Sequence, residues 1–410
     1  MASSFTWLDY SEQDRRKMLD VISLFREQTT RDELGIGAIR DAFANLFFPG
    51  VSTIQTRARY FLFIPWIYQD LISRKTTSQQ VGGKLRQQEV DLINILAGRA
   101  DNDGTIGKVS KAALKRLPSS VYWYGLGSWG IYRYGGSSQQ EYHQAFDRLN
   151  RSSRRPQHND DGEVLGLHST EWDPQLPPPP ADFPNSASFR LTAAEADYLA
   201  DHVSQRHPRS LLAHLVRQPE PSKVAFPWQH PVLSSLPPGL QEQLLHAQNF
   251  SELIHGAALL YNLMLAEAKP GTTLVESYRT GLQQWATQLS ARAETLQGWD
   301  RQAFWQLVNQ QAGPVSLRTQ SFVNQWFDLA LEPDSAFSMA DNADARAQIH
   351  DREAALKGKQ ARLDNPRALE LWLGDSGVGQ LNFRWPTVSK IMNDILTGLA
   401  EKEVDYDVAA

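Results

Sequence analysis

Apolar residues are densest between positions 30 and 71, where their pattern predicts two helices joined by a tight turn. Pro49 and Gly50 end the first helix, because proline forces its predecessor out of the α region and glycine accepts the turn. The second helix, predicted over about residues 53–72, is apolar on every side, so we expect it to be buried and kinked at Pro65. Its unbroken apolar run is far shorter than the roughly 20 residues that cross a bilayer, which argues against a membrane span.

Polar residues at capping spacing indicate where these helices begin. Thr30 with Glu33, and Ser52 with Gln55, have the spacing of a capping box, in which two side chains satisfy backbone N–H groups left free at a helix start. An earlier pair of the same kind predicts another helix over residues 12–27.

Apolar positions recur at alternating three- and four-residue steps from residue 240 onward, as packed helical hairpins require. Pro270 and Gly271 join the first two helices of this part. Further helices are predicted at about residues 301–311, 317–331, 341–357 and 387–401, with a short strand at 381–385. The pattern therefore predicts a C-terminal α-helical bundle.

Residues 107–136 combine a short basic helix, predicted over 110–117, with a second helix that Ser119 or Ser120 would cap. A glycine-rich run from Gly130 to Gly136 then resembles a β-hairpin. This order predicts a winged helix-turn-helix, in which the start of the second helix lies near base edges in the major groove. A small packing element without a ligand is the alternative interpretation.

Prolines mark residues 151–238, four of them in succession at 177–180, and predict a loop or hinge region. One helix, over about residues 192–204, interrupts it. Trp172 and Phe183 stand among the prolines, which indicates that the loops are pinned onto neighbouring structure.

Charge is distributed unevenly along the 410 residues. The chain has a formal net charge of −5. Residues 51–136 contain twelve basic and five acidic side chains, a net +7, which leaves −12 for the remainder. A basic segment within an acidic chain is typical of a local polyanion site, although a solvated basic face has the same composition.

Several kinds of chemistry are excluded or poorly matched. The chain contains no cysteine, so disulfides, cysteine-based zinc sites and cysteine nucleophiles are excluded, and a reducing cytoplasm suits this composition. The Gly-x-Gly-x-x-Gly run at 125–130 is not followed by a helix that could hold a pyrophosphate. Val378 stands where a Gly-x-Ser-x-Gly nucleophile motif needs its last glycine. No metal or cofactor is therefore predicted, although Asp9, Asp41 and Asp364 could still meet in a discontinuous carboxylate site.

The chain resembles one family of bacterial proteins. The similarity is carried by residues 5–10 and 30–68, and by residues 358–398 with Trp372, Gly374 and Asp394. The family is DUF6361, a domain of unknown function. The resemblance implies an association with helicase, phospholipase D-like nuclease and DNA-methylase genes in phage-defence clusters, but it assigns no catalytic residue.

These observations predict a mainly α protein with an N-terminal helical core (1–100), a winged-helix-like module (101–150), a proline-rich hinge region (151–238) and a C-terminal helical domain (239–410). The leading hypothesis is a non-catalytic, cytoplasmic subunit of an anti-phage defence assembly that binds DNA, or RNA, and docks a helicase or nuclease partner. A metal-dependent nuclease or hydrolase and a purely structural adaptor are the alternatives. The predicted nucleic-acid-binding residues are Arg57, Arg59, Lys108, Lys111, Lys115, Arg116, Ser119, Ser120, Tyr122, Trp123 and Arg133.

Overall fold

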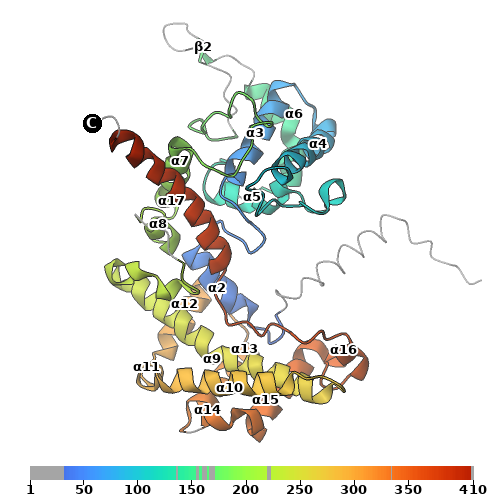
Figure 1. The fold of residues 1–410 in the computed structure, drawn as a ribbon, viewed down its shortest axis with the longest axis vertical. Coiled ribbons are helices and arrows are strands. Elements are labelled where there is room, and N and C mark those ends of the chain that lie inside the picture. The colour runs from blue at the N-terminus through green and yellow to red at the C-terminus, as the bar shows by residue number, and fades with distance from the viewer. Residues whose placement is uncertain are drawn as a thin grey trace, which may run out of the picture. The chain divides into compact units, whose positions relative to one another are not determined.

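The structure is a computed structural model that describes residues 32–134, 137–153, 157–158, 164–165, 171–218, 223–333 and 335–407. These residues are mainly α-helical, which confirms the mainly α part of the predicted fold class (Figure 1). The helices are α2 (Gly37–Phe47), α3 (Tyr60–Ser73), α4 (Ser78–Ala97), α5 (Pro118–Ser128), α6 (Gln139–Ser153), α7 (Ala193–Arg206), α8 (Leu211–Leu215), α9 (Pro238–Ala268), α10 (Val275–Ser290), α11 (Ala293–Gln297), α12 (Arg301–Ala312), α13 (Leu317–Leu331), α14 (Ser335–Ser338), α15 (Ala343–Lys357), α16 (Pro366–Glu370) and α17 (Trp385–Asp407). Two short antiparallel strands, β1 (Gln157–His158) and β2 (Val164–Leu165), pair with each other.

The chain divides into two compact units, each made from two separate stretches. Unit 1 combines Met1–Ala42 with His246–Leu381, and unit 2 combines Phe43–Leu245 with Asn382–Ala410. The helix predicted at 12–27 lies outside the described residues of unit 1. No helix in the part of the chain that the structure describes is long and apolar enough to span a membrane.

Helix α3 forms the centre of unit 2. Ten of its fourteen residues are buried, which confirms that this apolar helix is a core element. Helices α4 and α5 pack against it, and α6 packs against α4 (Figure 1). Phe61 of α3 stacks on Trp129 with ring centroids 3.9 Å apart, and Tyr68 stacks on Trp172 at 5.3 Å. Aromatic pairs of this kind add about 0.5–1.5 kcal/mol beyond the area that they bury.

The start of α3 differs from the prediction. The helix begins at Tyr60 and not near residue 53, although Gln55 does accept the Ser52 N–H as a capping side chain would. Residues 53–59 form turns and irregular backbone, and their N–H groups have other partners: those of Thr56 and Arg57 donate to the Tyr122 hydroxyl, at 2.8 and 3.0 Å. These tertiary hydrogen bonds replace the helical ones that residues 53–59 would otherwise form.

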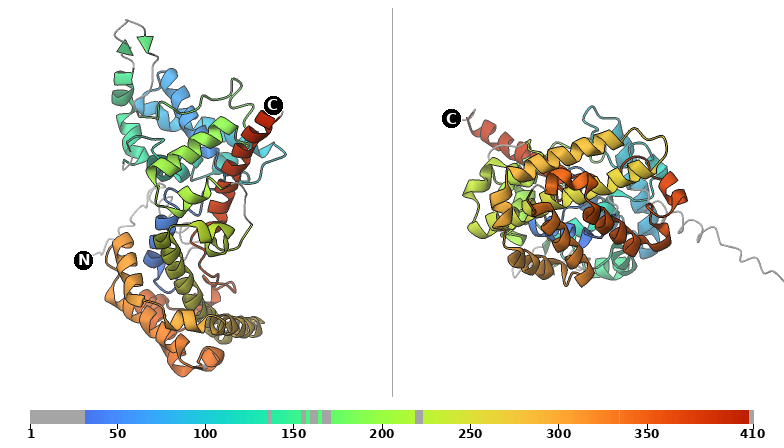
Figure 2. Two further views of the ribbon diagram at one scale, coloured as in Figure 1. Left: turned by 90° about the vertical axis from the view of Figure 1, so that its left-hand side faces the viewer. Right: turned by 90° about the horizontal axis from the view of Figure 1, so that it is seen from below.

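Helix α17 lies alongside α7 within unit 2, as the views in Figure 2 also show. Helix α7 begins with the complete capping box of Thr192 and Glu195, close to the predicted start of this helix. The two helices approach closely at Gly398, where an added Cβ would lie 2.8 Å from the Cβ of Ala196. A small residue is therefore required on α17 at this crossing.

Helices predicted for the C-terminal part are present in unit 1, where α12, α13 and α15 lie within two residues of their predicted positions. The indole N–H groups of Trp285 and Trp326 donate to carbonyls of α9, each at 2.8 Å. The strand predicted at 381–385 is wrong. Phe383 and Arg384 adopt φ angles of 52° and 70°, which no strand accepts, and α17 begins at Trp385.

Candidate nucleic-acid interface

Residues 105–117, which we call the basic loop, form the second part of the connection from α4 to α5, and side chains of α3 and α4 hold their backbone. The Ile106 N–H donates to the Tyr60 hydroxyl at 3.0 Å, and Arg86 of α4 donates to the carbonyls of Ala112 and Leu114 at 2.7 and 3.0 Å. Gly104 enters the loop with φ at 84°, and a Cβ there would lie 2.7 Å from Cγ of Arg57. Hydrogen bonds to backbone groups of Ile106, Ala112 and Leu114 thus hold the loop in place.

The exposed side of the basic loop is cationic. Lys108, Lys111, Lys115 and Arg116 are all exposed. Lys108 donates to the amide oxygen of Asn102 at 2.8 Å, and this neutral acceptor does not cancel its charge. No aspartate or glutamate occurs anywhere from Gly104 to Gln140, so this stretch supplies no carboxylate of its own. Four cations within nine residues create a local positive potential that favours a polyanion.

The predicted winged helix-turn-helix is not formed by the described residues. Where its first helix was expected, the chain makes only a 3₁₀ turn, Lys111–Ala113, which ends before Leu114. Where a hairpin was expected, Tyr132 forms a single bridge with Trp172, and Gly135 and Gly136 lie outside the described residues. Trp172 comes from the proline-rich part of the chain, so the backbone groups that would have built the wing pair over a long range.

Three residues that were predicted to contact nucleic acid form hydrogen bonds inside unit 2 instead. Ser119 is buried and donates its N–H and hydroxyl to Glu89, at 2.6 and 2.9 Å. Tyr122 is completely buried, and its hydroxyl also donates to the Arg57 carbonyl at 2.9 Å. Trp123 donates to the Ser137 carbonyl at 2.8 Å. In contrast, Ser120 is exposed on α5.

Glu89 is the buried carboxylate that fixes the start of α5. Burial raises its pKa from 4.5 to about 7, and the two Ser119 hydrogen bonds only partly oppose this shift. The folded chain therefore keeps a proton that the unfolded chain releases between pH 4.5 and about 7. It follows that the free energy of unfolding falls as the pH rises through this window.

Replacing Glu89 with glutamine is expected to abolish this part of the pH dependence. The wild-type protein should lose about 2–3 kcal/mol of stability, relative to the variant, between about pH 5 and about pH 8. Urea unfolding of both proteins at the two pH values measures the difference. If the two proteins lost stability in parallel, Glu89 would not be the titrating group.

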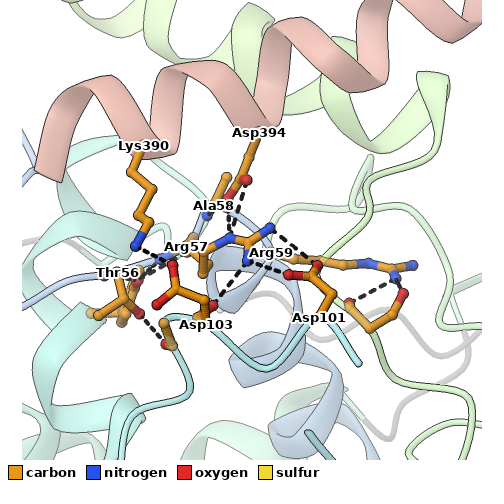
Figure 3. A network of polar contacts seen from close by, with 11 residues as sticks. Thr56, Arg57, Ala58, Arg59, Asp101, Asp103, Lys390 and Asp394 are labelled. Atoms are coloured by element: carbon orange, nitrogen blue, oxygen red, sulfur yellow. Dashed lines mark hydrogen bonds and ion pairs between the residues drawn. The ribbon is translucent and has the colours of Figure 1, made fainter. Parts of the chain in front are cut away.

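Arg57 lies at the centre of an ion-pair network rather than on the surface (Figure 3). Its Nε is 3.0 Å from a carboxylate oxygen of Asp394 on α17, and its Nη1 is 3.1 Å from Asp101. Only 11% of the side chains of Arg57 and Asp394 is exposed. The guanidinium also lies 4.5 Å above the Phe189 ring. Since two carboxylates and a ring face occupy this cation, a phosphate could bind it only by displacing them.

Arg59 is paired in the same way. Its Nη2 is 2.7 Å from Glu195, and its Nη1 donates to the Ser188 carbonyl at 3.0 Å. The residue is only 5% exposed. Arg57 and Arg59 therefore connect the start of α3 with α7 and α17, and carboxylates inside unit 2 neutralise their charges.

The structure thus separates the predicted residues into two sets. Six of them are exposed between positions 108 and 133: Lys108, Lys111, Lys115, Arg116, Ser120 and Arg133. Sequence reasoning missed Tyr124, which is 67% exposed, and Tyr134, which is 52% exposed, within the same stretch. The signal for Tyr124 was its helical spacing of four from Ser120, which places both side chains on one face of α5.

A pocket in unit 2 is a further candidate site, but its lining does not favour nucleic acid. A pocket of about 560 Å³ lies between α3, α4 and residues 179–184. Its polar lining includes Asp70 and Asp91, and Asp70 already accepts hydrogen bonds from Arg74 and Gln88. Two carboxylates against one arginine make the pocket unfavourable for phosphate.

The candidate carboxylate site also gains no support from the described residues. Asp9 lies outside them, Asp41 pairs with Arg40 at 3.1 Å, and Asp364 lies 2.8 Å from His350. Within the described residues there is no group of three or more histidine and carboxylate side chains that could hold a metal ion.

Comparison of the whole sequence with known protein families identifies one family. The sequence model of the family of unknown function DUF6361 matches residues 2–398. The chain belongs to the DUF6361 family. No curated protein and no solved structure matches it, so family membership assigns no ligand to the basic loop or to the Arg57 network.

Proposed function

We propose that this DUF6361 protein is a non-catalytic subunit that binds nucleic acid through the basic loop. The observation that carries the proposal is the set of four exposed cations at positions 108–116, within a stretch of 37 residues that contains no carboxylate. Lysine and arginine side chains on an exposed, anchored loop suit phosphate oxygens, because their charges are opposite. Contacts of this kind position a nucleic acid without reading its sequence. The assembly that this subunit would join is a bacterial defence complex with a helicase or nuclease, as the family resemblance implies.

Removing the charge of the basic loop tests the proposal. The variant carries Lys108→Gln, Lys111→Gln, Lys115→Gln and Arg116→Gln. We expect its affinity for a mixed-sequence DNA duplex to fall at least about tenfold at low salt. The dependence of log affinity on log salt should become shallower by about 1 for each cation that contacts a phosphate. Fluorescence anisotropy over a salt series measures both quantities.

A matched control removes four exposed cations that lie elsewhere. The control variant carries Arg209→Gln, Arg318→Gln, Lys359→Gln and Arg367→Gln, all at exposed positions. It changes the net charge by the same amount, so a general electrostatic effect would weaken both variants equally. Equal weakening, or unchanged binding by the basic-loop variant, would contradict the proposed interface.

A structural adaptor is the second candidate, and exposed leucines of unit 1 favour it. Leu371 and Leu373 are 77% and 76% exposed on either side of the buried Trp372, and Leu317 is 82% exposed. Exposed leucines of this kind are typical of protein contacts. An adaptor predicts that the wild-type protein binds neither DNA nor RNA at low salt, which the anisotropy measurement decides.

A further inference from the structure

Residues 105–134 expose apolar and aromatic side chains as well as cations. Val109, Tyr124 and Tyr134 are 94%, 67% and 52% exposed. They are three of nine large hydrophobic side chains that are exposed in the described residues, and they fall within 26 residues. Exposed apolar side chains that occur close together in the chain, among exposed cations, mark a candidate binding surface.

Helix α5 explains why Tyr124 is exposed. Its buried side carries Val121, Tyr122 and Leu126, which fit against α3. Ser120 and Tyr124 are four residues apart, so they share the opposite face of the helix. The exposed Arg116 lies two residues before this helix, so an exposed cation is close in sequence to the face that carries Tyr124.

Tyr134 lies close to the same helix. Its ring centroid is 6.4 Å from that of Tyr132, whose own ring is 4.7 Å from Trp123, the neighbour of Tyr124. The Ser137 hydroxyl donates to the Tyr134 carbonyl, and the Ser137 carbonyl accepts from Trp123. These contacts tie the segment that carries Tyr134 and the exposed Arg133 to α5.

We infer that this surface binds a single-stranded nucleic acid, an inference that rests on the proposed function. Its bases stack on Tyr124 and Tyr134, and its phosphates contact the cations of the basic loop and Arg133. Stacking on an aromatic side chain contributes about 1–3 kcal/mol per base and tolerates any sequence, because every base has a flat face. In a duplex those faces are covered by neighbouring base pairs, so the two tyrosines would contribute little to duplex binding.

An anionic membrane is the competing partner for a basic surface with apolar residues. Interfacial segments insert tryptophan, phenylalanine or leucine side chains into the acyl boundary. Between residues 105 and 134, the exposed large hydrophobic side chains are one valine and two tyrosines. This set provides flat rings for stacking and little aliphatic bulk for insertion, and it therefore favours the nucleic acid.

The double variant Tyr124→Ala with Tyr134→Ala tests the inference. Anisotropy with a labelled oligothymidylate and with a mixed-sequence duplex of equal length compares the two ligands. Each tyrosine removed should weaken binding of the single strand by about 5- to 100-fold, while duplex binding changes by less than about twofold. Tyr124→Phe with Tyr134→Phe keeps the rings and should restore single-strand binding. Because both side chains are exposed, thermal unfolding of the variants should match the wild type.

A matched control is Phe337→Ala, which removes an aromatic side chain that is 43% exposed in unit 1 and should leave single-strand binding unchanged. Equal weakening of both ligands, or no weakening, by the tyrosine variant would overturn the inference. If the basic-loop variant loses duplex binding while the tyrosine variant binds the single strand normally, the proposed function stands and the stacking surface does not. Absence of any nucleic-acid binding would remove both. Tyrosine-dependent binding to phosphatidylserine vesicles, without oligothymidylate binding, would assign the surface to a membrane.

Discussion

Replacing Arg57 with methionine is expected to destabilise the protein by about 3–5 kcal/mol, because it leaves the buried carboxylate of Asp394 without its cation. The remaining partner of that carboxylate is the Ala58 N–H, at 2.9 Å. Asp101 and the Asp103 carbonyl also lose their hydrogen bonds to the guanidinium. Urea unfolding monitored by tryptophan fluorescence measures the loss, since the buried tryptophans of unit 2 report on its core.

Asp101→Asn provides the matched control within the same network. The Asp101 side chain is 56% exposed, so its ion pair with Arg57 should contribute less than about 1 kcal/mol. The double variant of Arg57→Met with Asp394→Leu removes both charges and should recover part of the lost stability. If Arg57→Met unfolded like the wild type but failed to bind nucleic acid, Arg57 would belong to the interface and not to the fold.

Replacing Glu353 with glutamine is expected to cost about 3–4 kcal/mol in unit 1. Glu353 is completely buried and accepts hydrogen bonds from Tyr261, Lys357 and the N–H groups of Arg362 and Leu363. A glutamine side chain offers one oxygen, and its amide group would face donors, so at least one N–H loses its acceptor. Urea unfolding measures the effect. Asp351→Asn, on the exposed side of the same helix, should change stability by less than about 0.5 kcal/mol.

Acidification should act on the same carboxylate. Burial opposes its charged form, but the hydrogen bonds outweigh burial and hold the pKa of Glu353 below its usual value of 4.5. A carboxylate with a lowered folded pKa stabilises the fold above its unfolded pKa, and this contribution is lost as the pH falls through the folded pKa. The wild-type protein should therefore lose stability relative to Glu353→Gln below about pH 4.5, opposite in sign to the dependence expected for Glu89. A constant difference between the two proteins across this range would contradict this assignment.

The charge count of residues 51–136 overstated the available positive charge. Arg57 and Arg59 belong to that basic segment, but their counter-charges come from Asp394 and Glu195, which are more than a hundred residues away in sequence. A count along the chain includes only neighbours in sequence, and ion pairs form between neighbours in space. The basic loop remained cationic for the opposite reason: no acid occurs within its own stretch, and no carboxylate in the described part of the chain pairs with Lys111 or Arg116.

Periodicity predicted α12, α13 and α15 of unit 1 and α7 of unit 2 well, because these helices bury one stripe against neighbours and expose the other. The same approach failed between residues 53 and 59, where Ser52 and Gln55 have capping spacing but the helix begins only at Tyr60. It also failed for the wing at 130–136, since glycine-rich sequences permit a hairpin without requiring one. The backbone partner is the Tyr122 side chain in the first place and Trp172 in the second, and no local pattern could identify either residue.

The sequence alone determined that this protein is mainly helical, that the helix at α3 is buried and that residues 108–116 are basic. Each of these properties depends on composition and on spacing within a few turns of helix. Tertiary structure decided which cations meet solvent and which are neutralised inside unit 2, and it left Tyr124 on α5 and Tyr134 exposed to solvent. The physical reason is that burial and ion pairing depend on distances in space, which a chain of helices sets only when it packs.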